Sequence, residues 1–400
     1  MLRRIVNHLV REGLTHLDDA PPEAMRKAFR VLRWCARRTG VTLPEELDPR
    51  LVRSAVGIIG RAIADTPYGH PLQFECPLIV TIAISDYCPF ACTNCYSSSG
   101  GGAGSRATEQ EPASFERLAA SQTPVVLVTG GEPMASNSTR PGIVRLLDSG
   151  KAVYVSTNAS IEGYLQVAAR YPLLMFILPV WGNRTQHDEQ RGRRSFERVT
   201  ENLRMLESVG RKAWLLVVIT NDDLSVFDAV EELARTHSVA LVRITRKVRV
   251  GRNDGPGPEV TPQFVRSVEE GARRLKRYVR NVVIDLPETR GERRLARVAH
   301  ALGIPHYRSC AAGNWMMHMD ARGDAYPCYT FEGGTQGRVS SMTSVVDQWR
   351  LVRERRAELG DGDICIGEAL ATRTEISEAR HPLRLVNSGF PREATKRSSA

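Results

Sequence analysis

The stretch Cys88-Pro-Phe-Ala-Cys92-Thr-Asn-Cys95-Tyr96 decides how the rest of the chain is interpreted. It places three cysteines at the spacing C-x3-C-x2-C, directly after the apolar run 77–84, which is typical of a buried strand. A [4Fe-4S] cluster normally uses four cysteines, so a cluster held by these three would leave one iron open. A structural zinc site is the alternative. Zinc favours four ligands in paired C-x2-C units, and no fourth Cys or His follows within this loop.

An open iron can bind a small molecule through an amine and a carboxylate, and S-adenosylmethionine (SAM) carries both groups. One electron can then cleave the sulfonium and release a carbon radical that abstracts hydrogen, a chemistry supplied by the cofactor. The C-x3-C-x2-C-aromatic motif resembles the radical SAM superfamily, and the resemblance covers about residues 76–330. It implies an α/β fold, a partial (β/α)6 TIM-like barrel with the cluster at its mouth.

The hydrophobic pattern agrees with this fold, because apolar runs alternate with amphipathic segments from residue 77 onward. Six strands are expected, at 77–84, 125–128, 152–155, 173–178, 213–219 and 240–244, with a further one at 282–284. Helices are expected at 113–121, 140–149, 161–171, 195–209, 225–237 and 262–280. The predicted domains are a helical N-terminal segment (1–72), the core barrel (73–290), a small C-terminal subdomain (291–372) and a polar tail (373–400).

The second expected strand is followed by Gly130-Gly131-Glu132-Pro133. Glycines at a strand end let a backbone approach a ligand closely. The segment resembles the GGE motif of the superfamily, which implies that its backbone, with Glu132 nearby, contacts the methionyl amine of SAM. A side chain at Gly131 is expected to occupy space that the methionyl group needs.

The third expected strand ends in Ser156-Thr157-Asn158. This segment is similar to one that reaches the ribose and sulfonium region of SAM in relatives, and short polar side chains suit hydroxyl contacts. Ser156 and Asn158 are therefore candidate SAM contacts. A helix cap is an equally good interpretation of Asn158.

Further along, the stretch from His187 to Gly192 matches an H-D-x-x-R-G run of the superfamily. Arg191 is the candidate partner of the SAM carboxylate, because a guanidinium pairs well with that group. The segment before it departs from the family pattern, with Pro179 in place of a serine and Trp181 in place of an aspartate. Trp181 could stack on the adenine, line the substrate site or belong to the core.

A second group of cysteines begins with Cys310, Gly323 and Cys328, spaced C-x12-G-x4-C. The turn-forming stretch 320–324 between them predicts a β-hairpin with one cysteine on each arm. The spacing resembles SPASM and twitch extensions, and implies a twitch-like hairpin and helix holding an auxiliary [4Fe-4S] cluster. Only Cys365 follows, so one auxiliary cluster is expected at most. A pair of buried cysteines is the alternative.

The fourth ligand of that auxiliary cluster stays open. Twitch relatives usually end with C-x2-C, and the same spacing from Cys365 reaches Glu368. Glu368 could ligate iron through oxygen, Asp363 could take its place, or substrate or water could occupy the iron. Cys35 and Cys76 lie in apolar contexts and are expected in the core.

The composition excludes few functions. The formal net charge of +10 favours anionic ligands weakly and fits solvated arginine-rich helices, and no nucleic-acid motif is evident. No apolar run approaches the ~20 residues that span a bilayer. The chain opens without a signal peptide and carries a metal-type cysteine cluster, so a cytoplasmic location is expected.

The leading functional hypothesis is a radical SAM oxidoreductase or rearranging enzyme. It would abstract hydrogen from a C–H bond of a small polar metabolite or natural-product precursor, with flavodoxin or ferredoxin as electron donor. The first alternative is a maturase of a ribosomal precursor peptide, favoured by the SPASM-like spacing but weakened by residues 1–72, which lack the strands of a peptide-recognition domain. The second alternative is a non-enzymatic iron–sulfur or zinc protein.

Overall fold

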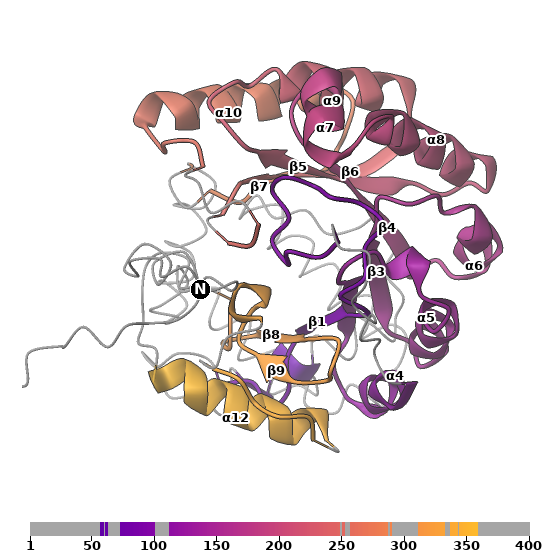
Figure 1. Cartoon of the computed structure of the whole chain (residues 1–400), viewed down its shortest axis with the longest axis vertical. Coiled ribbons are helices and arrows are strands. Elements are labelled where there is room, and N and C mark those ends of the chain that lie inside the picture. The colour runs from indigo at the N-terminus through magenta and orange to yellow at the C-terminus, as the bar shows by residue number, and fades with distance from the viewer. Residues whose placement is uncertain are drawn as a thin grey trace, which may run out of the picture.

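The computed structural model describes residues 57–59, 61–62, 73–100, 112–248, 250–252, 257–286, 289, 311–332, 337–342 and 344–358. Most of the predicted N-terminal helical segment and the whole polar tail lie outside these residues. The described part is built on one curved sheet with helices along its outer side (Figure 1).

The sheet has nine strands in the order β7-β6-β5-β4-β3-β2-β1-β8-β9. Their bounds are β1 Ile79–Ala83, β2 Val125–Thr129, β3 Ala152–Ser156, β4 Leu174–Val180, β5 Ala213–Ile219, β6 Val239–Arg246, β7 Val282–Ile284, β8 Met316–Met319 and β9 Ala325–Tyr326. Every pair is parallel except β8 with β9. The predicted α/β barrel class is confirmed, and each of the seven predicted strands is present.

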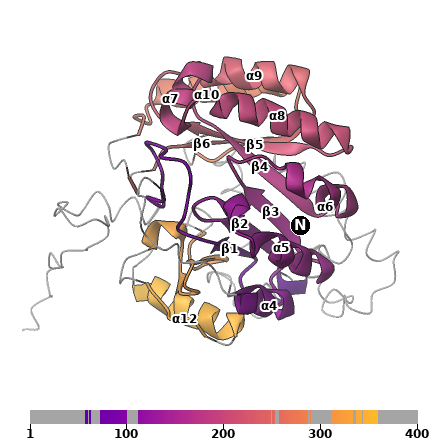
Figure 2. The same ribbon diagram turned by 45° about the vertical axis from the view of Figure 1, so that its right-hand side comes forward.

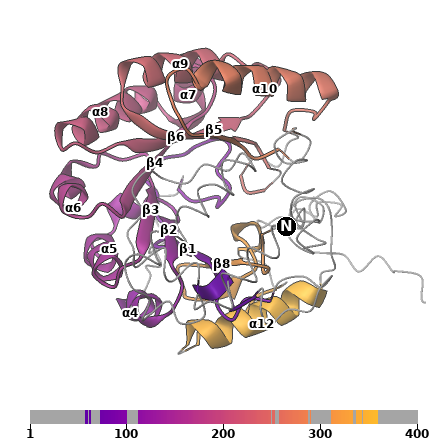
Figure 3. The ribbon, with the colours of Figure 1, turned by 180° about the vertical axis from the view of Figure 1, so that it is seen from behind.

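Helices follow the strands in the alternation that the sequence predicts. They are α4 Pro112–Ala120, α5 Thr139–Asp148, α6 Leu165–Arg170, α7 Arg184–Arg191, α8 Ser195–Ser208, α9 Val226–Thr236, α10 Pro262–Leu275 and α12 Val345–Glu358. Three short 3-10 turns complete the described elements: η2 Pro133–Ala135, η3 Glu162–Tyr164 and η4 Tyr329–Phe331. Seen from behind, α4, α5, α6, α8, α9 and α10 form a ring around the arc of strands (Figure 3). Helix α7 was not predicted, and α12 was expected only as a helix of the C-terminal subdomain, without bounds.

The main core lies between this helix layer and the sheet. Along β5, Ala213, Leu215, Val217 and Ile219 are buried, whereas the alternate side chains are partly exposed. The buried set belongs to one continuous cluster with helix residues such as Phe227 of α9. On the other face, the rings of Tyr154 and Trp214 lie 4.5 Å apart. The outer face is therefore tightly packed, and the concave face carries the partly accessible side chains.

The C-terminal hairpin joins the barrel sheet directly. Its first strand β8 pairs in parallel with β1, with Ile79 opposite Met316. The predicted hairpin is present, but its attachment to the first barrel strand was not expected. Helix α12 packs beneath it, and Trp349 Nε1 of this helix donates to the carbonyl of Phe74 at 2.8 Å. The predicted core barrel and C-terminal subdomain thus share one sheet.

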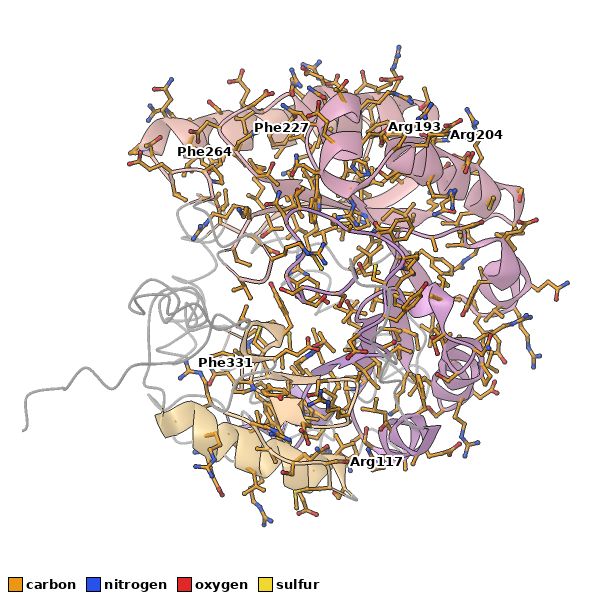
Figure 4. All side chains as sticks on the ribbon, viewed as in Figure 1. Arg117, Arg193, Arg204, Phe227, Phe264 and Phe331 are labelled. Carbon is orange, nitrogen blue, oxygen red and sulfur yellow. The ribbon has the colours of Figure 1, made fainter. Side chains whose placement is uncertain are left out.

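The main core extends along the whole sheet, and a small second apolar cluster lies beside the hairpin. Phe227 and Phe264 lie in the layer of α9 and α10, and Phe331 lies at the opposite end beside the hairpin (Figure 4). Phe331 forms a small second cluster with Ala312, Tyr326 and Cys328. Within the described ranges, no helix is long and apolar enough to cross a membrane.

Candidate active site

The three cysteines of the first motif lie in the loop 84–100, which follows β1 and runs inside the arc of strands (Figure 2). Cys88 and Cys92 are buried and Cys95 is half-buried. Burial raises the pKa of the Cys88 thiol to about 12, with smaller increases from Glu132, Cys92 and Cys95. Among the described residues no group of three His, Cys, Asp or Glu is placed to hold a metal ion, so ligation of iron stays a prediction.

The loop is fastened to the end of β2 by the Gly-Gly-Glu segment. The amide of Gly131 donates to the carbonyl of Ser85 at 2.6 Å, and the amide of Glu132 donates to that of Tyr87 at 2.9 Å. A Cβ atom on Gly131 would lie 1.9 Å from the Tyr87 oxygen and 3.1 Å from the Cys88 amide nitrogen. The space beside Gly131 is therefore filled by the protein's own backbone. This differs from the expectation that the methionyl group fills it.

Glu132 joins the ends of two neighbouring strands. Its carboxylate accepts hydrogen bonds from the Met134 amide at 3.0 Å, the Thr157 hydroxyl at 2.6 Å and the Asn158 amide at 2.9 Å. The side chain is 2% exposed, and burial raises the pKa of Glu132 while these hydrogen bonds oppose the increase. A carboxylate bound in this way holds the end of β3 against the end of β2. Contact of Glu132 with the methionyl amine remains a prediction.

Arg191 and Trp181 lie together beside these strand ends. The guanidinium carbon of Arg191 stands 4.2 Å from the centre of the Trp181 ring, an arrangement that favours a cation. One guanidinium nitrogen, Nη2, donates to Asn158 Oδ1. The Asn158 side chain thus binds Arg191, and no helix cap is formed by it. Both Arg191 and Trp181 are buried, so Trp181 shares features of a core residue and of a site residue.

Two donors in this pair fit a bound anion. Arg191 Nε and Trp181 Nε1 are buried and have no hydrogen-bond partner in the part of the chain that the structure describes. Burial lowers the pKa of Arg191, and the nearby Cys92, Cys95, Glu132 and Cys88 act in the opposite direction. A buried guanidinium with an unfilled donor, next to three thiols, is suited to a carboxylate or a thiolate-bound cluster. These residues therefore fit the [4Fe-4S] and SAM pair that the motif implies.

Helix α7 positions Arg191, which is its last residue. The helix begins with a capping box, in which Asn183 Oδ1 accepts from the Gln186 amide and Gln186 Oε1 accepts from the Asn183 amide, both at 3.0 Å. His187 lies on the buried side of this helix, and its Nδ1 accepts from the Trp181 amide at 3.1 Å. Burial lowers the pKa of His187 to about 3. The imidazole is therefore neutral at physiological pH and holds the strand end below Arg191.

The same helix also holds the cysteine loop. The carbonyl of Gln190 accepts from the Thr93 amide at 2.9 Å, and its side-chain oxygen accepts from Asn94 Nδ2 at 2.7 Å. The loop residues between Cys92 and Cys95 are thus fixed to the turn that carries Arg191. This arrangement brings two of the predicted motifs, the cysteines and the H-D-x-x-R-G run, into one site.

The aromatic residue of the motif, Tyr96, connects the loop with the C-terminal segment. Its hydroxyl lies 2.6 Å from Thr129 Oγ1 at the end of β2. Its ring packs edge-on against Tyr329, with the ring centres 4.8 Å apart. Tyr329 directly follows Cys328, so the two cysteine-bearing regions meet through these rings.

The remaining predicted residues have different outcomes. Ser156 is the last residue of β3 and is half-buried. Cys328 is buried beside Tyr326 and Phe331, and Cys76 belongs to the main core, as expected. Five predicted residues lie outside the described ranges: Cys35, Cys310, Asp363, Cys365 and Glu368.

Sequence reasoning missed two residues of this site. Thr157 lies within the quoted strand-end segment, and its hydroxyl binds Glu132, so its position next to Asn158 was the available signal. Arg252 follows β6 and its guanidinium meets the cysteine loop about 160 residues earlier in the chain. No local pattern marks such a residue, because its partners are distant in sequence.

A family model described as the radical SAM superfamily matches residues 82–234, which include the cysteine loop, the Gly-Gly-Glu segment and α7. Residues 82–234 of the chain therefore belong to the radical SAM superfamily. The other comparisons give similar proteins of two kinds, curated proteins and solved structures.

Among curated proteins, the chain is similar to the mycofactocin maturase MftC of Mycobacterium tuberculosis, with 26% identity over 277 residues. The match covers 64% of this chain and 66% of that relative, which is just under two thirds of the relative's length. MftC of Mycolicibacterium smegmatis is 26% identical over 335 residues, covering 75% of this chain and 81% of the relative.

Among solved structures, the fold is similar to that of SuiB from Streptococcus suis bound to S-adenosylmethionine. The TM-score is 0.60 at 16% identity, covering 87% of this chain and 85% of the other. The anSMEcpe structure with bound AdoMet gives a TM-score of 0.51 at 14% identity, covering 70% and 82%. At these identities the likeness concerns the fold alone.

Proposed function

We propose that this chain is a radical SAM enzyme that modifies a precursor peptide made by the ribosome. The observation that carries the proposal is the similarity to mycofactocin maturases over 277 residues. The fold likeness to SuiB, which has also been solved with its precursor peptide SuiA, supports the same class of substrate. The peptide alternative is thereby favoured over a small polar metabolite and over a non-enzymatic metal protein.

In the proposed enzyme, Cys88, Cys92 and Cys95 hold three irons of the [4Fe-4S] cluster. When bound, the cluster and SAM supply a carbon radical that abstracts hydrogen from the substrate. Arg191 orients SAM through its carboxylate, using the buried Nε that has no partner within the described residues. Asn158 and Trp181 hold the guanidinium in place from two sides.

Cys328 belongs to the proposed auxiliary cluster, with Cys310 and Cys365 as further ligands. The contact between Tyr96 and Tyr329 supports this role, because it places the segment after Cys328 against the first cysteine loop. An auxiliary cluster near the SAM cluster suits oxidative chemistry, in which the substrate radical must pass on one electron.

The test is anaerobic reconstitution of the whole chain with iron, sulfide, SAM and dithionite, followed by measurement of 5′-deoxyadenosine. The protein should produce it, and the Cys88→Ala/Cys92→Ala/Cys95→Ala variant should not. Short peptides encoded next to the gene are then added, and the peptide mass is measured. A mass change that requires SAM supports the proposal. If 5′-deoxyadenosine forms but the mass of no such peptide changes, the choice of substrate is wrong. If no 5′-deoxyadenosine forms, the enzyme class is wrong.

A further inference from the structure

The segment that follows β6 binds the cysteine loop through Arg252. The amide of Arg252 donates to the carbonyl of Cys95 at 2.9 Å. Its guanidinium Nη1 donates to the carbonyl of Cys92 at 2.6 Å. One side chain therefore contacts the backbone of two predicted iron ligands.

The second guanidinium nitrogen reaches the far end of the same loop. Nη2 donates to the carbonyls of Gly100 at 3.1 Å and Ser98 at 3.3 Å, and also to that of Ser99. The planar fork of arginine can bind several carbonyls at once, which the point charge of lysine cannot reproduce. Arg252 thus closes the loop from Cys92 to Gly100 around itself.

Gly251 allows this close approach. Its φ angle is +87°, and a Cβ atom would lie 2.1 Å from the Cys95 oxygen and 2.4 Å from the Tyr96 oxygen. The backbone before Arg252 therefore packs directly against the loop, without a side chain between them. The segment therefore contacts the cysteine loop through its backbone at Gly251 and through the side chain of Arg252.

Two serine hydroxyl groups, those of Ser99 and Ser97, connect the segment bound by Arg252 with the sulfur atom of Cys95. Ser99 Oγ lies 2.7 Å from Ser97 Oγ, and Ser97 Oγ lies 3.4 Å from Cys95 Sγ. Ser99 is buried. When Cys95 is a thiolate it can only accept, so Ser97 donates to it, and Ser99 completes the chain.

The charge of Arg252 and the hydrogen bond from Ser97 would both act on the reduction potential of a bound cluster. Hydrogen bonds to cluster sulfur atoms and nearby charges set reduction potentials. Arg252 Nη1 lies 2.6 Å from the carbonyl oxygen of Cys92, so the positive charge of Arg252 lies close to this predicted ligand. A positive charge and a donated hydrogen bond both favour the reduced, more negative cluster.

We propose that Arg252 and Ser97 are positioning residues that retain the SAM-cleaving cluster and raise its reduction potential. The inference rests on the proposed function only in that the cluster must be present. It assigns a redox role to a segment after β6 that the cysteine motif does not contain.

The test is a redox titration of the reconstituted whole protein, followed by electron paramagnetic resonance of the signal that changes when SAM is added. Iron and sulfide content are measured in parallel. In Arg252→Gln the midpoint potential should fall, with the reduced fraction at a fixed potential about tenfold smaller. That corresponds to about 60 mV for a one-electron couple. Iron retention should fall as well.

Two further variants separate the charge from the hydrogen bonds. Arg252→Lys keeps the charge and should restore most of the potential but less of the iron content. Ser97→Ala should lower the potential by a smaller amount and keep the iron. Arg204→Gln is the matched control, because Arg204 is exposed on α8, far from the loop (Figure 4).

Wild-type potential in both Arg252→Gln and Ser97→Ala would overturn the inference and leave the proposed function intact. If Arg252→Gln retains no cluster, its midpoint potential cannot be measured. The midpoint potentials of Ser97→Ala and Arg252→Lys then test the inference. Absence of any SAM-responsive signal in the wild-type protein would overturn both proposals together.

Discussion

The two cysteine-bearing regions of the molecule differ in how far along the sequence the residues lie that fix their loop or turn. The loop 84–100 takes its shape from residues far along the chain, namely Gly131, Gln190 and Arg252. In the hairpin region 311–332 the turn is closed locally, where Asp320 Oδ1 accepts from the Arg322 amide at 2.9 Å and the Asp324 amide at 3.0 Å.

This difference tells us where each site is vulnerable. The SAM-cluster loop can be disrupted from three distant positions without touching a cysteine. The hairpin has a locally closed turn, and it is also held by the pairing of β8 with β1 and by Gln348 of α12, whose Nε2 donates to the Gly323 carbonyl at 3.0 Å. The predictions below test the comparison, beginning with the largest expected effect.

The largest effect is expected from removing the ligands themselves. Cys88→Ala/Cys92→Ala/Cys95→Ala should abolish formation of 5′-deoxyadenosine and leave the iron of the proposed auxiliary cluster, because Cys328, its proposed ligand, lies outside the loop 84–100. Cys328→Ala is the matched variant and should lose auxiliary iron while keeping the SAM-responsive signal. Iron analysis and paramagnetic resonance measure both. Loss of all iron in either variant would show that the two regions are not independent.

Gly131→Ala should be the most damaging single change outside the cysteines. Its new Cβ would lie 1.9 Å from the Tyr87 oxygen, so the backbone leading to Cys88 must move. We expect less than a tenth of wild-type cluster content after reconstitution, as judged by iron and absorbance. Gly163→Ala is the control, since a Cβ there meets nothing within 4 Å. Equal cluster content in the two variants would contradict this role of Gly131.

Arg191→Ala should weaken SAM binding while leaving the cysteine loop in place. Losing a charged hydrogen bond costs about 1.5–3 kcal/mol, or roughly 10- to 150-fold in affinity. Arg193→Ala is a suitable control, because Arg193 is exposed just beyond α7 (Figure 4). Isothermal titration of the cluster-loaded protein with SAM measures the difference. Wild-type affinity in Arg191→Ala would show that the family role does not extend to this residue.

His187 offers a smaller, pH-dependent test of the support from α7. Its folded pKa, about 3, lies below the ordinary value of 6.5. Between these values the unfolded chain binds more protons, so stability rises with pH and is lost as pH falls below 6.5. The contribution amounts to about 2 kcal/mol between pH 7 and pH 5. In His187→Gln this part of the pH dependence should vanish from urea unfolding curves. An unchanged slope would mean that His187 is accessible to protons in the folded state.

The regular elements of the barrel could be predicted because their signal is local. The run 213–219 alternates buried and partly exposed side chains along β5, and the other strands were found by similar apolar runs. Helix α7 escaped prediction because its residues, Arg184–Arg191, are polar on every side. Only the Asn183 and Gln186 capping box marks its start. Helix α12 carried a usable signal in the spacing of Val345, Trp349 and Val352, which are buried.

The site residues that lie within sequence motifs could be predicted. The cysteines, the Gly-Gly-Glu segment and Arg191 were found from spacing and family resemblance, and the structure brings them together. The contacts of Glu132 with Thr157 and of Arg252 with the cysteine loop join distant segments. The hydrophobic periodicity of a sequence is a local signal and does not indicate contacts between distant segments. The pairing of β8 with β1 escaped for the same reason.

That last pairing has a consequence for how the chain is made. The Thr81 hydroxyl on β1 donates to the carbonyl of Met317 on β8, which is 236 residues away in sequence. At about 5–20 residues per second, β1 waits roughly 10–50 seconds on the ribosome before its second neighbour is synthesised. Until then, one edge of β1 lacks its final partner, and an open apolar edge favours association with other chains. Slowly translated or overproduced protein should therefore aggregate through this edge, and chaperones that shield nascent chains should improve its yield.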